Sequence, residues 1–104
     1  MTQVVEIVNF KLDQGYTKAD FLSANDKMDE FLKQQTGVLY RSLCEKEDGS
    51  FVDIVYWQNM AAAKNGQQAF YQSPLCQQFA QCIEKESVQL EHVEVIASFG
   101  CDNA

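Results

Sequence analysis

The sequence predicts a single α+β domain whose four-stranded antiparallel sheet carries its helices on one face. Segments rich in β-branched and aromatic residues alternate with segments whose apolar residues recur every three or four positions, in the order β-α-β-β-α-β. Asp48-Gly49 joins the second and third strands and suits a tight hairpin. The 104 residues make one ordinary domain, with an expected core over residues 4–99 and a polar tail at 100–104.

The first half of the chain predicts a strand, a helix and a second strand. Residues 4–12 (VVEIVNFKL) form the first strand and residues 38–47 the second. Thr17 and Asp20 have the spacing of a capping box, and Gly37 is expected to end the helix. The predicted buried stripe of this helix consists of Phe21, Ala24, Met28, Phe31 and Leu32.

The second half repeats this order. Residues 51–57 (FVDIVYW) predict the third strand and residues 88–99 the fourth. Asn59 is expected to cap the helix between them, which Ser73-Pro74 divides, because proline suits only the first turn of a new helical segment. Two such halves joined by a hairpin make the ferredoxin-like split βαβ motif.

Both faces of the predicted sheet are apolar. In the third strand, one face carries Val52, Ile54 and Tyr56, and the other carries Phe51, Val55 and Trp57. A two-layer domain needs only one apolar face, so we expect a second copy of the chain to cover the other in an isologous homodimer. The alternative is a monomer with a less regular sheet.

Composition excludes several classes of partner. The net charge of −7 repels phosphate backbones, and Arg41 is the only arginine, so we expect no nucleic-acid partner. No apolar run approaches the roughly 20 residues of a membrane span, and Met1-Thr2-Gln3 leads directly into a strand without a signal sequence. We therefore expect a cytoplasmic protein without a membrane partner.

The cysteines and the single histidine predict no metal site and no disulfide framework. None of the four cysteines forms a C-x-x-C pair. Cys44, Cys76 and Cys82 are expected to be small core residues, and Cys101 an exposed thiol near the tail.

From Val4 to Phe99, the pattern resembles the dimeric α+β barrel proteins of the antibiotic-biosynthesis-monooxygenase type. The matching segments are VVEIVNFKL, EKEDGSFVDIVYW, QNMAAAK, FYQSPLCQQF and SVQLEHVEVI. The resemblance implies a homodimer with apolar pockets and, in the oxygenase members, chemistry that needs no cofactor.

Haem-degrading members of this superfamily use an Asn on the first strand, a Trp on the second helix and a His later on that helix. Asn9 matches the first of these positions, but the other two fall near Gly66 and Ala80. Haem degradation is therefore not expected.

Three residues are candidates for catalysis. His92 suits a general base, or it is a structural histidine paired with Glu91 or Glu94. Asn9 offers an amide that could hold a substrate oxygen, or it bonds neighbouring backbone. Asp53, in an apolar strand, is a base with a raised pKa or, as we favour, the partner of Arg41 or Lys11.

Several aromatic side chains are candidates to line a ligand pocket, although aromatic residues of small domains more often form the core. These candidates are Tyr56, Trp57, Phe70, Tyr71 and Phe79. Two functions remain open. One is a cofactor-independent monooxygenase acting on a small aromatic or quinone-like substrate. The other is a non-catalytic or stress-related module that binds an apolar molecule.

Overall fold

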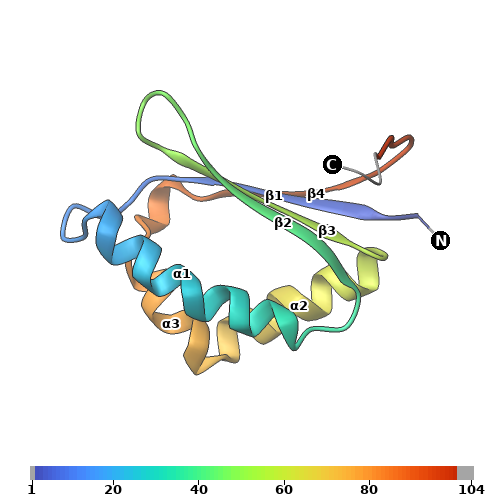
Figure 1. Cartoon of the computed structure of the whole chain (residues 1–104), viewed down its shortest axis with the longest axis horizontal. Coiled ribbons are helices and arrows are strands. Elements are labelled where there is room, and N and C mark those ends of the chain that lie inside the picture. The colour runs from blue at the N-terminus through green and yellow to red at the C-terminus, as the bar shows by residue number, and fades with distance from the viewer. Residues whose placement is uncertain (1, 101–104) are drawn as a thin grey trace.

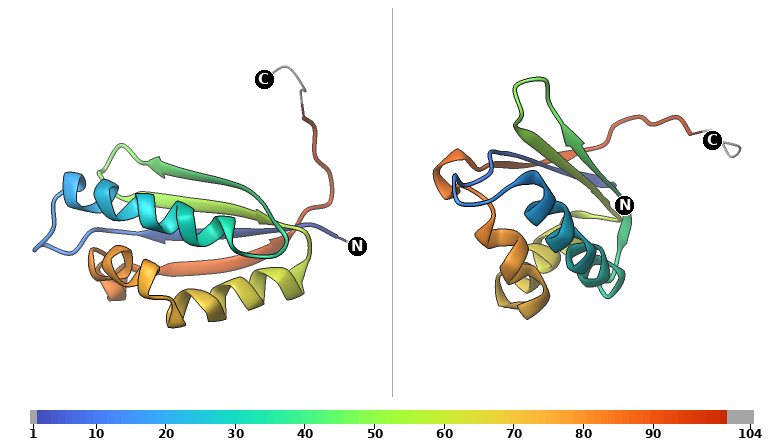
Figure 2. Two further views of the ribbon diagram at one scale, coloured as in Figure 1. Left: turned by 60° about the horizontal axis from the view of Figure 1, so that its bottom comes forward. Right: turned by 60° about the vertical axis from the view of Figure 1, so that its left-hand side comes forward.

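The structure is a computed structural model that describes residues 2–100. Its four strands form one antiparallel sheet in the order β2-β3-β1-β4. Figure 1 shows α1, α2 and α3 together below the sheet, and the two views in Figure 2 show the same two layers. This confirms the predicted ferredoxin-like α+β fold, with its helices on one face.

The elements follow the predicted order, and the second helical region is divided in two. The strands are β1 Val4–Phe10, β2 Val38–Glu45, β3 Phe51–Trp57 and β4 Gln89–Glu94, and the helices are α1 Lys18–Lys33, α2 Met60–Gln72 and α3 Pro74–Gln81. One turn of 3-10 helix, Lys85–Ser87, leads into β4.

The start of α1 is as predicted, but its end is not. The Thr17 side chain accepts a hydrogen bond from the Asp20 backbone, and the Asp20 carboxylate accepts one from the Thr17 backbone, which closes the capping box. All five residues of the predicted apolar stripe are buried. The helix ends at the cap residue Gln34, and Gly37, with a φ of +88°, makes the turn into β2 instead.

The predicted starts of α2 and α3 are confirmed. The Asn59 side chain accepts a hydrogen bond from the Ala62 backbone N–H, and the Ser73 hydroxyl accepts one from Leu75 N–H. Pro74 occupies the first turn of α3, where its missing N–H removes no helical hydrogen bond.

The register of the strands defines two faces of the sheet. Direct cross-strand partners share a face, so the buried residues Phe51, Val55 and Trp57 of β3 mark the face that the helices cover, here called the helix face. The other face, here called the open face, has no helix over it (Figure 1). Its residues are Val5, Ile7, Asn9, Tyr40, Ser42, Cys44, Val52, Ile54, Tyr56, Gln89, Glu91 and Val93.

Three strands are shorter than predicted. β2 ends at Glu45 instead of residue 47. β1 ends at Phe10, and Leu12 makes only an isolated bridge to Ile83. β4 ends at Glu94 instead of Phe99, because its ladder partner Val4 is the first residue of β1. Beyond this point the chain has little sheet left to pair with.

An ion-pair network fastens α1 to the sheet. The Arg41 guanidinium donates two hydrogen bonds to the Asp53 carboxylate, of 2.9 and 2.7 Å, from Nε and Nη2. Its Nη1 donates to Asn25 at 2.6 Å and to Asp29 at 2.8 Å, both on α1. The Arg41 side chain is only 8% exposed, so its charge depends on these partners in place of water.

Trp57 and Gly66 set how closely α2 approaches the sheet. The indole is 2% exposed, and a Cβ built on Gly66 would lie 2.2 Å from Cη2 of Trp57 and 2.7 Å from its Cζ2. Both distances are far below van der Waals contact. Only glycine therefore lets the helix backbone lie against the ring.

Replacing Gly66 by alanine should destabilise the protein by about 2 kcal/mol, which corresponds to a fall in Tm of roughly 10 °C. In an ordinary helix interior, the same change would stabilise the protein by about 1 kcal/mol. The sign of the change in the free energy of unfolding therefore tests the contact. Urea and thermal unfolding measure it. Gly15→Ala is the control, because its Cβ would lie an ordinary 3.5 Å from Asp13 Oδ1. A Gly66→Ala protein as stable as wild type would contradict the contact.

Candidate functional site

Glu6, His92 and Trp57 meet on the helix face. Glu6 on β1 and His92 on β4 are direct cross-strand partners, and His92 Nε2 lies 3.6 Å from Glu6 Oε1. The Trp57 indole N–H donates a hydrogen bond of 3.1 Å to the same carboxylate oxygen. The side chains of His92 and Glu6 are 12% and 13% exposed, so this carboxyl–imidazole pair is largely withdrawn from water.

Burial dominates the electrostatics of this pair. It raises the pKa of the Glu6 carboxyl above its usual range, because a partly buried carboxylate loses hydration, and the nearby Asp53 charge acts in the same direction. His92 and the Trp57 N–H act in the opposite direction, since each favours the charged carboxylate. Net, the carboxyl holds its proton more tightly than a free glutamate does.

The imidazole has an unused nitrogen. His92 Nε2 is buried and makes no hydrogen bond within residues 2–100. A proton on this imidazole would turn the 3.6 Å approach to Glu6 into an ion pair. A carboxylate beside an imidazole is an arrangement that can take a proton from a substrate and stabilise the resulting imidazolium.

His92 pairs with a carboxylate other than the two that were expected. The expected partners were Glu91 and Glu94. Glu91 points to the open face, and Glu94, two residues beyond His92 on β4, lies opposite Val4. Glu6 lies directly opposite His92. The sequence did contain a signal for Glu6. Residues 4, 6 and 10 fall on the same face of a strand, so Glu6 is predicted to share the buried face with Val4 and Phe10.

The other two catalytic candidates lie elsewhere. Asp53 is 5% exposed and pairs with Arg41 as favoured, so both of its oxygens already accept hydrogen bonds. Asn9 pairs with Val52 and Gln89 and lies on the open face, across the sheet from His92 and Trp57. The structure therefore does not bring Asn9, Trp57 and His92 to one cavity.

The five candidate pocket aromatics do not gather at one place. Trp57 and Phe79 are buried in the core, and Phe70 is half-buried. Tyr56 lies on the open face, next to Tyr40, and Tyr71 is 70% exposed on α2. Of the group, only Trp57 contacts the carboxyl–imidazole pair.

The cysteines divide between the two faces. Cys76 and Cys82 are buried as predicted, and burial raises the pKa of both thiols, which keeps them protonated. Cys44 is exposed on the open face, contrary to the expectation of a core position. Side chains of a strand alternate between the two faces, and Cys44 lies on the same face as Tyr40, whereas Leu43 lies on the helix face. Cys101 lies outside the described residues.

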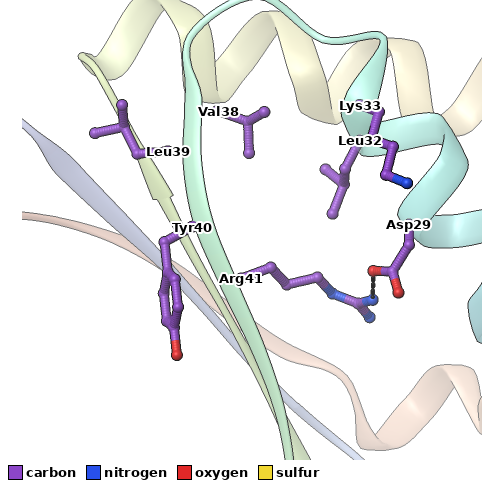
Figure 3. Close-up of a pocket in the computed structure, with 7 residues that line it drawn as sticks. All are labelled: Asp29, Leu32, Lys33, Val38, Leu39, Tyr40 and Arg41. Atoms are coloured by element: carbon purple, nitrogen blue, oxygen red, sulfur yellow. Dashed lines mark hydrogen bonds and ion pairs between the residues drawn. The ribbon is translucent and has the colours of Figure 1, made fainter. Parts of the chain in front are cut away.

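A hollow of about 300 Å³ lies at the β2 edge of the sheet, away from His92. Figure 3 shows Val38 and Leu32 pointing into the space between β2 and α1, while Leu39 and Tyr40 lie on the other side of the strand. Arg41 and Asp29 border it through their ion pair. This hollow is called the β2 groove below.

The described residues hold no cluster of potential metal ligands and no helix suited to span a membrane. Between residues 2 and 100, no group of three or more His, Cys, Asp or Glu side chains is placed to hold a metal ion. In the same part of the chain, no helix has the length and apolar character needed to cross a membrane.

Known structures share this fold. SnoaB, a cofactor-independent oxygenase from Streptomyces nogalater, matches with a TM-score of 0.67 and 19% identity over 98% of this chain and 99% of its own. An antibiotic-biosynthesis-monooxygenase-like protein from Bordetella bronchiseptica gives 0.77 and 17%, over 93% and 100% of the two chains. One from Caulobacter crescentus gives 0.72 and 12%, over 92% of each.

Sequence comparisons add no closer relative. No protein-family model matches the chain, and no curated protein matches it. With identities of 12–19%, the likeness to the solved structures is one of fold. The chain has the fold of the antibiotic-biosynthesis-monooxygenase-like proteins.

Proposed function

We propose that the protein is a cytoplasmic, homodimeric monooxygenase that needs no cofactor and acts on a small aromatic or quinone-like substrate. The fold likeness to SnoaB supports the reaction class. The observation that carries the proposal is the partly buried Glu6–His92 pair on the helix face, because a reaction of this class begins with removal of a proton.

The proposed reaction oxidises an activated methylene carbon to a carbonyl. A base removes one proton, and the resulting carbanion reacts with O₂ to form a carbon–oxygen bond and a peroxide. The peroxide then loses water, so one CH₂ group and one O₂ become one C=O group and one H₂O. The protein has to supply the base and hold the anion in a site that excludes water.

His92 accepts the proton in this mechanism, and Glu6 stabilises the imidazolium that forms. Trp57 is a positioning residue, because its N–H holds the Glu6 oxygen that faces the imidazole. Asp53 stays with Arg41 and is not assigned as the base. Asn9 is given no part in this step, since the sheet separates it from His92.

His92→Gln should reduce oxygen uptake with anthrone substrates, which carry the activated methylene carbon, by about 100-fold, and Glu6→Gln by about 10-fold, as expected for loss of a base and of its stabilising charge. Oxygen-electrode rates measure both effects. Glu91→Gln is the matched control, because it removes a carboxylate from the other face of the sheet. Uptake that survives His92→Gln would exclude this base. Binding of the panel without any uptake would favour the non-catalytic binding module.

The pKa of Glu6 provides a second readout that needs no substrate. We expect the Glu6 carboxyl to titrate above the usual glutamate range in ¹³C NMR, and higher still in His92→Gln, because the imidazolium favours the carboxylate. The folded protein then binds this proton more tightly than the unfolded chain does. The stability that it contributes is present at low pH and is lost as pH rises through the folded pKa. A Glu6 titration at or below the usual range would contradict the burial argument.

The open face supports the homodimer. The centre of this face is apolar, formed by side chains from β1, β3 and β4, and its aromatic edge includes Tyr40, which is 61% exposed. A sheet face turned to water is normally polar. Covering it with a second copy would bury these side chains in an isologous interface.

Sedimentation velocity at micromolar concentration should show a dimer, and Ile54→Asp should weaken it at least tenfold, because an unpaired carboxylate would be buried in the interface. Leu22→Asp is the control, at a position on α1 that is 45% exposed and far from the open face. A monomeric wild-type protein would rule out the homodimer.

A further inference from the structure

Ionisable side chains from all four strands lie in a line across the helix face of the sheet. Arg41 on β2 and Glu6 on β1 are both direct partners of Val55 on β3. His92 on β4 lies directly opposite Glu6. Asp53, two residues before Val55 on β3, accepts two hydrogen bonds from the Arg41 guanidinium. Arg41, Asp53, Glu6 and His92 are called the charged row below.

The charged row is withdrawn from water along its whole length. The side chains of Arg41 and Asp53 are 8% and 7% exposed, and those of His92 and Glu6 are 12% and 13% exposed. Asp29, which also accepts a hydrogen bond from Arg41, is instead 53% exposed and borders the β2 groove (Figure 3). Buried charges are screened less than surface charges, so a change at one end of the row acts on the other end.

The charges of the row balance when the Glu6–His92 pair holds one proton. Arg41 stays positively charged at physiological pH, and its charge offsets that of Asp53. The Glu6 carboxylate is then left to be balanced by an imidazolium on His92 or by a proton of its own. The ion pair at the β2 edge therefore bears on how tightly this proton is held.

Asp53 is the member of the row through which Arg41 reaches Glu6. The direct partner of Asp53 is Val8, whereas that of Glu6 is Val55, so the two carboxylates are diagonal neighbours on adjacent strands, roughly 7 Å apart. Burial is the larger cause of the raised pKa of the Glu6 carboxyl, and the Asp53 charge adds to it. Because the guanidinium offsets the Asp53 charge, its loss would make the pair hold its proton more tightly.

The other ionisable groups near the pair are exposed or uncharged. On α2, these groups are Lys64 and Tyr71, and both are exposed. On β4, Glu94 lies on the helix face and is exposed as well. On α3, burial raises the pKa of the Cys76 thiol, which keeps it protonated. Asp53 is therefore the buried charge that acts on the pair from outside it.

We propose that Arg41 is a positioning residue that acts through Asp53 to set how readily the Glu6–His92 pair takes up and releases its proton. The guanidinium holds and offsets the Asp53 carboxylate, and this keeps the pair free to accept a proton from the substrate. The part that concerns catalysis rests on the proposed function. The part that concerns the proton of the pair is independent of it.

The first test is the titration of Glu6 in ¹³C NMR. Arg41→Gln should raise its midpoint by about one pH unit, because a buried carboxylate roughly 7 Å away loses its counter-charge. Asp53→Asn should lower the midpoint by about as much, because the guanidinium charge then remains and still has Asp29 as a partner. The double variant Arg41→Gln/Asp53→Asn removes both charges and should return the midpoint close to that of wild type.

These opposite shifts separate an electrostatic role from a structural one. Arg41 also fastens α1 to the sheet, and a loosened helix would change the Glu6 titration in the same direction in all three variants. Shifts of one sign, or a midpoint that none of the variants moves, would overturn the proposal. If Arg41→Gln does not fold, Asp53→Asn decides alone, because a midpoint that is unchanged or raised in it has the same consequence.

Lys18→Gln is the matched control. It removes one positive charge, as Arg41→Gln does, and it breaks another ion pair between α1 and β2, because Lys18 Nζ lies 2.6 Å from Glu45 Oε1. This pair lies at the other end of the sheet, where Glu45 is the partner of Phe51. The Glu6 midpoint should not move. A shift as large as that in Arg41→Gln would assign the effect to net charge or to the position of α1, and would overturn the proposal.

The second test is the pH profile of oxygen uptake with an anthrone. In Arg41→Gln the acid limb of kcat/KM should move to higher pH by about one unit, and in Asp53→Asn it should move to lower pH. A limb that stays in place while the Glu6 midpoint moves would overturn the role of Arg41 in the reaction. A wild-type protein without oxygen uptake would remove the proposed function, and the Glu6 titrations would still decide whether Arg41 controls the proton of the pair.

Discussion

The contact between Trp57 and Gly66 is the constraint on which the candidate site depends. Because residue 66 has no side chain, α2 lies against the indole, and the ring cannot turn away from the sheet. Its N–H is then held toward Glu6, and this hydrogen bond keeps one carboxylate oxygen beside His92. A packing requirement of the core thus fixes the geometry of a polar pair.

The helix face of the sheet has two differently built parts. At one end, Phe10, Phe21, Phe51 and Phe79 pack with ring centroids 4.9–6.4 Å apart and form an apolar core. Toward the other end lie Glu6 and His92, and the Asp53–Arg41 pair lies on the same face. The two carboxylates differ in their partners, since Asp53 has a bidentate guanidinium and Glu6 has an indole N–H and an imidazole. Glu6, and not Asp53, is therefore the carboxylate beside the imidazole, and burial raises the pKa of its carboxyl.

The two faces of the sheet thereby serve different proposed purposes. Chemistry is assigned to the helix face, where the side chains of His92 and Glu6 are 12% and 13% exposed. Association is assigned to the open face, where apolar side chains remain uncovered in the single chain. Asn9 and Cys44 both lie on the open face, the side assigned to association. Their residue types alone had suggested a contact with substrate for Asn9 and a core position for Cys44.

The sequence by itself determined the α+β fold, the order of its elements, the capping residues Thr17, Asn59 and Ser73, and the buried stripe of α1, because these depend on local spacing and turn chemistry. It also indicated the Asp53–Arg41 pair and the two apolar faces of the sheet. Only the tertiary structure decided the partner of His92, the separation of Asn9 from that site and the end of β4 at Glu94. These depend on which residues of distant strands lie opposite one another. A strand's own sequence shows its alternation but not its register, and the register follows from how the whole sheet pairs and packs on its helices.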